Sequence, residues 1–158
     1  MESTQQSNRE TYRAILLGQG GNELLLAPVG DGFVLPSVEI PRWQRVAENM
    51  TVAIRNKWGQ EAICLFKPDV NTPVTSANDH YYQVMECSGP ARPHPRAEWI
   101  PVSSLSERTF VDPEDQVAVL RSLAECDRRV GAAALGPFAR LGWFGELQQW
   151  IEEVIGPL

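Results

Sequence analysis

The sequence predicts an α/β domain in which helices pack on a mixed β-sheet. Short apolar runs bounded by glycine and proline indicate strands, and segments with apolar residues at every third or fourth position indicate helices. These two kinds of segment alternate along the chain. A length of 158 residues fits one domain of ordinary size.

The first part of the chain predicts a β-hairpin. Residues 1–10 are polar and without periodicity, so we expect a flexible arm there. Residues 12–17 and 23–27 are apolar runs joined by a glycine-rich loop, which can form a tight reversal. A shorter strand at residues 33–35 ends before Pro36, which has no backbone N–H for strand pairing.

A long amphipathic helix is predicted next, over residues 42–58. Its apolar positions recur at every fourth residue: Val46, Met50, Ile54 and Trp58. Gly59 follows directly and is typical of a helix C-cap. Strands are then expected at residues 62–66 and 80–87, with a long polar loop at 67–79 between them.

The later elements begin with a segment that cannot be regular, because residues 88–97 hold three prolines and a glycine. An edge strand is expected at 98–102. Asp112 followed by Pro113 predicts the start of a second helix, which ends near residue 126.

The expected domain therefore covers residues 11–127, and the C-terminal part differs from it. Residues 128–142 are rich in glycine and alanine and suit a linker, whereas 143–158 form a third amphipathic segment. Its apolar face is larger than a free tail should expose. This helix could pack back on the domain, form a homodimer or begin a further domain, and we favour the first two.

Charge and composition exclude several classes of function. Twenty acidic residues against 14 Lys and Arg give a net charge of -6, so we expect no binding to a nucleic acid polymer. No apolar stretch is long enough to cross a membrane and no signal sequence opens the chain, so we expect no membrane association. Cys64, Cys87 and Cys126 are too scattered for a disulfide framework, which favours a cytoplasmic location.

The order of these elements resembles the Nudix hydrolase superfamily, from about residue 12 to residue 126. The family's signature, the Nudix box, reads G-x5-E-x7-R-E-U-x-E-E-x-G-U, where U is a bulky aliphatic residue. With its last glycine on Gly59, the box spans Val38 to Gln60 without an insertion. The resemblance implies an α/β/α sandwich and a pyrophosphohydrolase whose glutamates hold Mg²⁺ or Mn²⁺.

The chemistry of this box is lost, although its spacing is kept. The positions of the conserved glutamates and arginine hold, in order, Gln44, Val52, Ala53, Asn56 and Lys57. None of them is a carboxylate, and hard divalent cations need several anionic oxygens. We therefore expect a degenerate Nudix box, no catalytic residues, no metal and no cofactor.

A ligand could still bind beside the altered helix. The polar or aromatic residues that we expect near such a ligand are Trp43, Arg45, Asn49, Asn56, Tyr81 and Glu98. Glu39 and Glu48 lie near the box and could belong to a relocated metal site, although surface carboxylates are more often simply solvated. His80 and His94 have no Cys or His partner at metal-binding spacing.

Three functions remain open. The first is a Nudix-fold module that binds a nucleotide-like ligand or a protein partner without hydrolysis. The second is an active hydrolase of a nucleoside diphosphate derivative with a relocated Mg²⁺ or Mn²⁺ site. The third is a structural module that assembles through the C-terminal helix.

Overall fold

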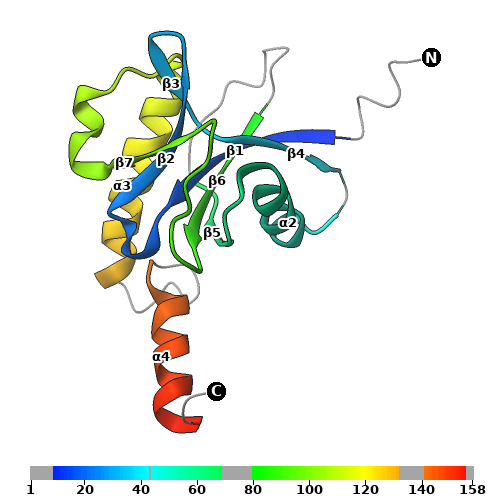
Figure 1. The fold of residues 1–158 in the computed structure, drawn as a ribbon, viewed down its shortest axis with the longest axis vertical. Helices are drawn as coiled ribbons and strands as arrows, with labels where there is room; N and C mark the ends of the chain where they lie inside the picture. The colour runs from blue at the N-terminus through cyan, green and yellow to red at the C-terminus, as the bar shows by residue number, and fades with distance from the viewer. Residues whose placement is uncertain (1–8, 43, 69–79, 132–140, 156–158) are drawn as a thin grey trace.

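The sheet is the centre of the structure, a computed structural model that describes residues 9–42, 44–68, 80–131 and 141–155. Within these ranges seven strands form one mixed sheet with the order β3-β2-β1-β6-β5, to which β4 is added beside β1 and β7 beside β2 (Figure 1). The strands are β1 Arg9–Leu17, β2 Glu23–Val29, β3 Gly32–Val34, β4 Ser37–Pro41, β5 Ala62–Phe66, β6 His80–Cys87 and β7 Glu98–Pro101. The helices are α2 Val46–Trp58, α3 Pro113–Gly131 and α4 Trp143–Ile155, with 3-10 turns η1 Gln19–Gly21 and η2 Val102–Glu107.

Strand β1 organises this sheet because one of its two edges changes neighbour along its length. One edge of β1 pairs in parallel with β6 over seven residue pairs, from Thr11–His80 to Leu17–Glu86. Its other edge pairs antiparallel with β4 and then, at Leu17, with Leu24 of β2. The expected hairpin is present, and the sheet opens between β2 and β4.

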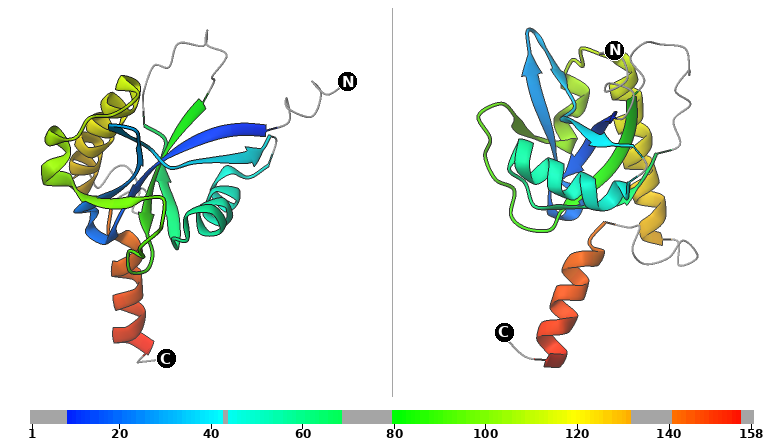
Figure 2. Two further views of the ribbon diagram at one scale, coloured as in Figure 1. Left: turned by 45° about the horizontal axis from the view of Figure 1, so that its top comes forward. Right: turned by 90° about the vertical axis from the view of Figure 1, so that its right-hand side faces the viewer.

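The two faces of the sheet are covered by different helices, as expected for an α/β/α sandwich (Figures 1 and 2). Side chains of β1 alternate between them: Ile15 and Leu17 join the core under α3, whereas Ala14 and Leu16 join the core under α2. The helix α2 contributes Met50, Ile54 and Trp58, and α3 contributes Ala118, Val119 and Cys126. The predicted fold class is therefore confirmed.

The start of α2 differs from the prediction. The helix begins at Val46, four residues after the expected start, because Arg45 is extended with φ -65° and ψ 113°. The preceding residues include a strand that sequence reasoning missed: in β4, Val38 and Ile40 are buried on either side of the exposed Glu39. Pro36, directly before this short strand, and Pro41, its last residue, hid its alternation.

Two other boundaries were wrong. Strand β1 begins at Arg9, inside the expected arm, because Arg9 and Glu10 pair with Pro41 and Ile40 of β4. The helix α3 continues to Gly131 and so takes in the first residues of the expected linker. No proline or glycine interrupts residues 127–130, so the helix continues.

The C-terminal helix α4 forms over Trp143–Ile155 as predicted, but it projects from the domain instead of folding back on it (Figures 1 and 2). Only its base is packed, where Leu141 and Trp143 contact the core under α3. Further along, Leu147, Trp150 and Val154 are exposed by 39%, 56% and 61%. A homodimer through this helix stays a prediction.

A buried carboxylate fixes the base of α4. The side chain of Glu86 in β6 is 3% exposed and accepts hydrogen bonds from two backbone N–H groups. One comes from Gly20 in η1 at 2.9 Å and the other from Gly142 at 2.8 Å. The hairpin turn and the entry to α4 are thus held by the same side chain.

A polar cluster holds α3 on the sheet. Arg13 of β1 donates to Asp112 at 2.7 Å and to Asp115 at 2.6 Å, and the Tyr82 hydroxyl donates to Asp115 at 2.8 Å. Asp112 also accepts the N–H of Glu114, which confirms its predicted N-cap role. Burial disfavours the charged form of Asp112, but the Arg13 guanidinium and this N–H together lower the pKa of its carboxyl.

None of the helices in the described ranges is long and apolar enough to cross a membrane.

The lowered pKa of Asp112 predicts a pH-dependent contribution to stability. A group with a lower pKa in the folded state stabilises above its unfolded pKa, which is about 4 for aspartate, and stops doing so as the pH falls through the folded value. Asp112→Asn keeps an N-cap side chain and removes the charge. The melting temperature of this variant should be below that of the wild type at pH 7, and the difference should shrink below about pH 4.

Melting temperatures by circular dichroism between pH 2 and pH 8 check this prediction. Asp127→Asn, on the exposed face of the same helix, is the charge-matched control. A difference between Asp112→Asn and wild type that is the same at all pH values would contradict the assigned role of the charge.

Gly59 gives a second prediction. It ends α2 in the left-handed conformation, with φ 69° and ψ 21°, while its N–H donates to the Arg55 carbonyl at 3.0 Å. Gly59→Ala should lower the free energy of unfolding by about 1 kcal/mol, because a Cβ is disfavoured at this φ. Gly89 is not among the glycines with positive φ, and a Cβ there would meet only the Glu61 Cβ, at 4.0 Å, so Gly89→Ala should change the free energy of unfolding by less than about 0.5 kcal/mol. Urea titrations of both variants measure the two changes.

Candidate functional site

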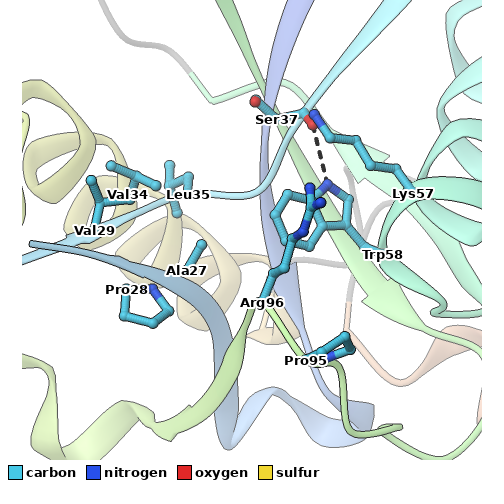
Figure 3. Close-up of a pocket in the computed structure, with 10 residues that line it drawn as sticks. All are labelled: Ala27, Pro28, Val29, Val34, Leu35, Ser37, Lys57, Trp58, Pro95 and Arg96. Atoms are coloured by element: carbon cyan, nitrogen blue, oxygen red, sulfur yellow. Dashed lines mark hydrogen bonds between the residues drawn. The ribbon is translucent and has the colours of Figure 1, made fainter.

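An open cavity of about 430 Å³ lies where the sheet separates between β2 and β4 (Figure 3). Its walls come from the β2–β3 hairpin, the start of β4, the C-terminal end of α2 and the loop before β7. The residues that line it are Ala27, Pro28, Val29, Val34, Leu35, Ser37, Lys57, Trp58, Pro95 and Arg96. The cavity lies where β1 changes its neighbour. At this point the chain passes from β3 into β4, and the Pro36 carbonyl between them accepts the N–H of Ala14 in β1 at 2.8 Å.

The wall formed by the hairpin is apolar, and the opposite wall is aromatic. Ala27 and Leu35 are buried at the base of the hairpin. Across the cavity, Trp58 is 6% exposed, and its indole N–H donates to the Ser37 carbonyl at 3.1 Å (Figure 3). This bond joins the end of α2 to the start of β4 and fixes the ring.

Two cations reach the cavity from different elements. Figure 3 shows the side chains of Lys57, from α2, and Arg96, from the loop before β7, both beside the Trp58 ring. The Lys57 ammonium is 5.6 Å from the centroid of that ring. The ten lining residues include these two cations and no carboxylate. The charge of the cavity is therefore positive, although the whole chain carries -6.

Trp58 also packs against His94, whose ring centroid is 5.3 Å from that of the indole. His94 also shapes the turn that carries Arg96, because its Nδ1 accepts the N–H of Arg96 at 3.1 Å and its carbonyl accepts the N–H of Ala97 at 3.4 Å. The histidine therefore packs on a residue of the cavity lining without being part of that lining.

The sequence candidates at the start of α2 lie outside this cavity and interact with one another. Arg45 pairs with Glu48 at 3.2 Å on the surface. The Asn49 side chain donates to the Arg45 carbonyl at 2.8 Å and to the Gln44 side chain at 3.3 Å. Val52, in the same helix, is exposed.

The other candidates are dispersed. Asn56 is exposed on α2, Glu39 is exposed on β4, and Glu98 is exposed at the start of β7. Tyr81 is half exposed and stacks on Tyr12 with 5.2 Å between ring centroids. Trp43 lies outside the described residues.

Among the altered box positions, Lys57 is the one that lines the cavity. Val38 is buried in β4 next to Ser37, Ala53 packs against the core under α2, and Gly59 ends the helix. Sequence reasoning missed Arg96, and for Trp58 it favoured packing in the core over stacking on a ligand. Arg96 has no recognisable local signal, because it reaches the cavity only through the folding of residues 88–97, the proline-rich loop before β7.

The altered box positions do not fit a divalent cation. Mg²⁺ and Mn²⁺ need several anionic oxygens, whereas these positions supply amides, alkyl groups and the Lys57 ammonium. The nearby Glu48 is paired with Arg45. Over the ranges that the structure describes, no three His, Cys, Asp or Glu side chains come together as a metal site.

The thiols of Cys64 and Cys87 are not suited to nucleophilic chemistry. Burial raises the pKa of Cys64 to about 11, although Lys67 acts in the opposite direction. Burial and then the neighbouring Glu86 raise the pKa of Cys87 to about 12. Both thiols are protonated at neutral pH, and the thiolate is the reactive form.

Comparisons with known proteins identify the fold. No protein-family model and no curated protein sequence matches the chain. Among solved structures, a putative oxidoreductase from Sinorhizobium meliloti is similar over 85% of this chain and 44% of its own, with 12% identity and a TM-score of 0.60. This chain thus spans less than half of that protein.

Two similar structures are named for Nudix-type activities. A hydrolase of the Nudix family from Clostridium perfringens matches 75% of this chain and 97% of its own, with 10% identity and a TM-score of 0.57. An ADP-ribose pyrophosphatase from Streptococcus suis matches 75% and 91%, with 14% identity and a TM-score of 0.52. At these identities the similarity shows the fold, and the chain has the Nudix fold.

Proposed function

We propose that this Nudix-fold chain binds a small anionic molecule of nucleotide-like chemistry in the cavity beside Trp58, without a metal ion and without hydrolysing it. The observation that supports the proposal is the charge of the cavity lining, in which Lys57 and Arg96 are present and carboxylates are absent. The Nudix fold and the activities for which its structural neighbours are named favour a phosphate-containing ligand.

The role of the metal is taken over by side chains in this proposal. In the box pattern, the position of Lys57 belongs to a glutamate that attracts a cation. An ammonium in its place attracts a phosphate oxygen directly. Arg96 adds a planar guanidinium, which binds phosphate oxygens through two parallel N–H donors.

The apolar wall supplies the second half of the binding surface. Ala27, Val34 and Leu35 face Trp58 across the cavity, so a flat group of the ligand would be packed between aliphatic and aromatic surfaces. A base attached to a phosphate has this combination of a flat apolar part and an anionic part.

Binding without turnover follows from the same lining. Hydrolysis needs a group that activates water, usually a carboxylate, a histidine or a metal-bound hydroxide. The ten lining residues include no carboxylate or histidine, and the box positions do not fit a metal. The ligand should therefore leave the site unchanged.

The test is an isothermal titration calorimetry experiment in which the wild-type chain is titrated with inorganic pyrophosphate and with nucleoside diphosphates in the presence of EDTA. Lys57→Glu should weaken binding by about tenfold or more, because one charge-assisted hydrogen bond contributes about 1.5–3 kcal/mol. Arg55→Glu makes the same charge change on an exposed position of the same helix, outside the cavity, and should leave the affinity within about twofold.

Two results would contradict the proposal. One is the absence of binding in EDTA with release of product on addition of Mg²⁺ or Mn²⁺, which would establish the hydrolase alternative. The other is an equal effect of Lys57→Glu and Arg55→Glu, which would reduce the interaction to the overall charge of the surface.

The affinity should also decrease as salt is added. The cavity is open, so ions screen the attraction between the two cations and the ligand, with a Debye length of about 10 Å at 0.1 M and about 3 Å at 1 M. The decrease should be smaller in Arg96→Ala, which has lost one of the two charges. Calorimetric titrations over a series of NaCl concentrations measure this difference.

A further inference from the structure

Gln60 is a polar residue at a position where the family pattern has an aliphatic one. It directly follows the C-cap of α2, and it is completely buried, with 0% exposure. Its amide makes three hydrogen bonds. The Nε2 group donates to the carbonyls of Arg92 at 2.7 Å and Trp58 at 3.1 Å, and Oε1 accepts the N–H of Arg92 at 2.9 Å.

These bonds tie the proline-rich loop to the end of the helix. The two bonds to Arg92 engage both its backbone N–H and its carbonyl. The Gln60 amide thus pairs with this loop residue in the way that the backbone of a neighbouring strand would. The Arg92 carbonyl also accepts the indole N–H of Trp99 at 3.0 Å. The loop is thus fixed at Arg92, four residues before Arg96.

The part of the loop beyond Arg92 has little freedom left. Pro93 and Pro95 restrict its backbone, and the turn at His94 accepts the N–H groups of Arg96 and Ala97. The position of Arg96 relative to Lys57 therefore depends on where Arg92 is held. Gln60 holds Arg92 at two backbone groups, and it does so from the same end of α2 that carries Lys57.

We propose that Gln60 is a positioning residue for the anion site: it holds the loop at Arg92 so that Arg96 reaches the cavity beside Lys57. This inference rests on the proposed binding of an anion in that cavity. Gln60 does not touch the ligand and acts through Arg96. An aliphatic residue at this position would pack in the same space but would leave both backbone groups of Arg92 without this partner.

A double-mutant cycle tests the coupling, with inorganic pyrophosphate as the probe in EDTA. Gln60→Met keeps the volume of the side chain and removes its hydrogen bonds. It should weaken pyrophosphate binding by about five- to tenfold in the wild-type background, and by less than about twofold in the Arg96→Ala background. An equal loss in both backgrounds would overturn the proposal, because it would show that Gln60 does not act through Arg96.

Gln83→Met is the matched control. Gln83 is also a buried glutamine, and its amide donates to the carbonyls of Phe66 and Val84, away from the loop. This variant should lower the melting temperature as Gln60→Met does and leave the affinity for pyrophosphate unchanged. If both variants weaken binding equally, the effect of Gln60 is a general loss of stability and the proposal fails.

Amide hydrogen exchange separates failure of this inference from failure of the proposed function. In Gln60→Met the N–H groups of Arg92, Arg96 and Ala97 should exchange faster than in the wild type, whereas those in the middle of α2 should be unchanged. Faster exchange in a chain that does not bind pyrophosphate would reject the ligand and keep the positioning of the loop. Unchanged exchange would reject the positioning, whether or not pyrophosphate binds. If Gln60→Met does not fold, Gln60→Asn, which keeps an amide but is one methylene too short to reach Arg92, replaces it in all three measurements.

Discussion

The pairing of β1 is the constraint on which the rest of the structure depends. One edge of this strand is filled by β6 from Thr11 to Leu17, whereas its other edge is shared between β4 and β2. Two strands cannot leave the same edge in different directions without separating, so the sheet opens beyond the Pro36 turn. The cavity is the space left by this separation, and the end of α2 and the proline-rich loop close its remaining sides.

Much of the fold could be predicted from local pattern. The apolar residues spaced four apart, Val46, Met50, Ile54 and Trp58, predicted α2, because a helix that covers a sheet must place its apolar residues on one side. The short strand β4 was missed, since Pro36 and Pro41 obscured the alternation of Val38 and Ile40. Its pairing partner is β1, and a contact between separate strands leaves no mark in either segment alone.

The candidate site was only partly predictable, for a similar reason. The replacement of the box glutamates was visible in the sequence, and it indicated an altered helix end at Lys57. Arg96 comes to the same cavity through a tertiary bond between Gln60 and Arg92. Its place depends on the folded path of the loop, so residue type and spacing could not reveal it. Conversely, Arg45 and Asn49 looked suitable as ligand contacts but are used in the first turn of α2.

The buried carboxylate of Glu86 has a mechanical consequence. Because it holds the N–H of Gly20 and that of Gly142, the hairpin turn and the root of α4 are attached to one point on β6. Any tilt of the projecting helix would therefore pull on Glu86 and, through it, on the turn between β1 and β2. This turn lies at the end of β1 that pairs with β2.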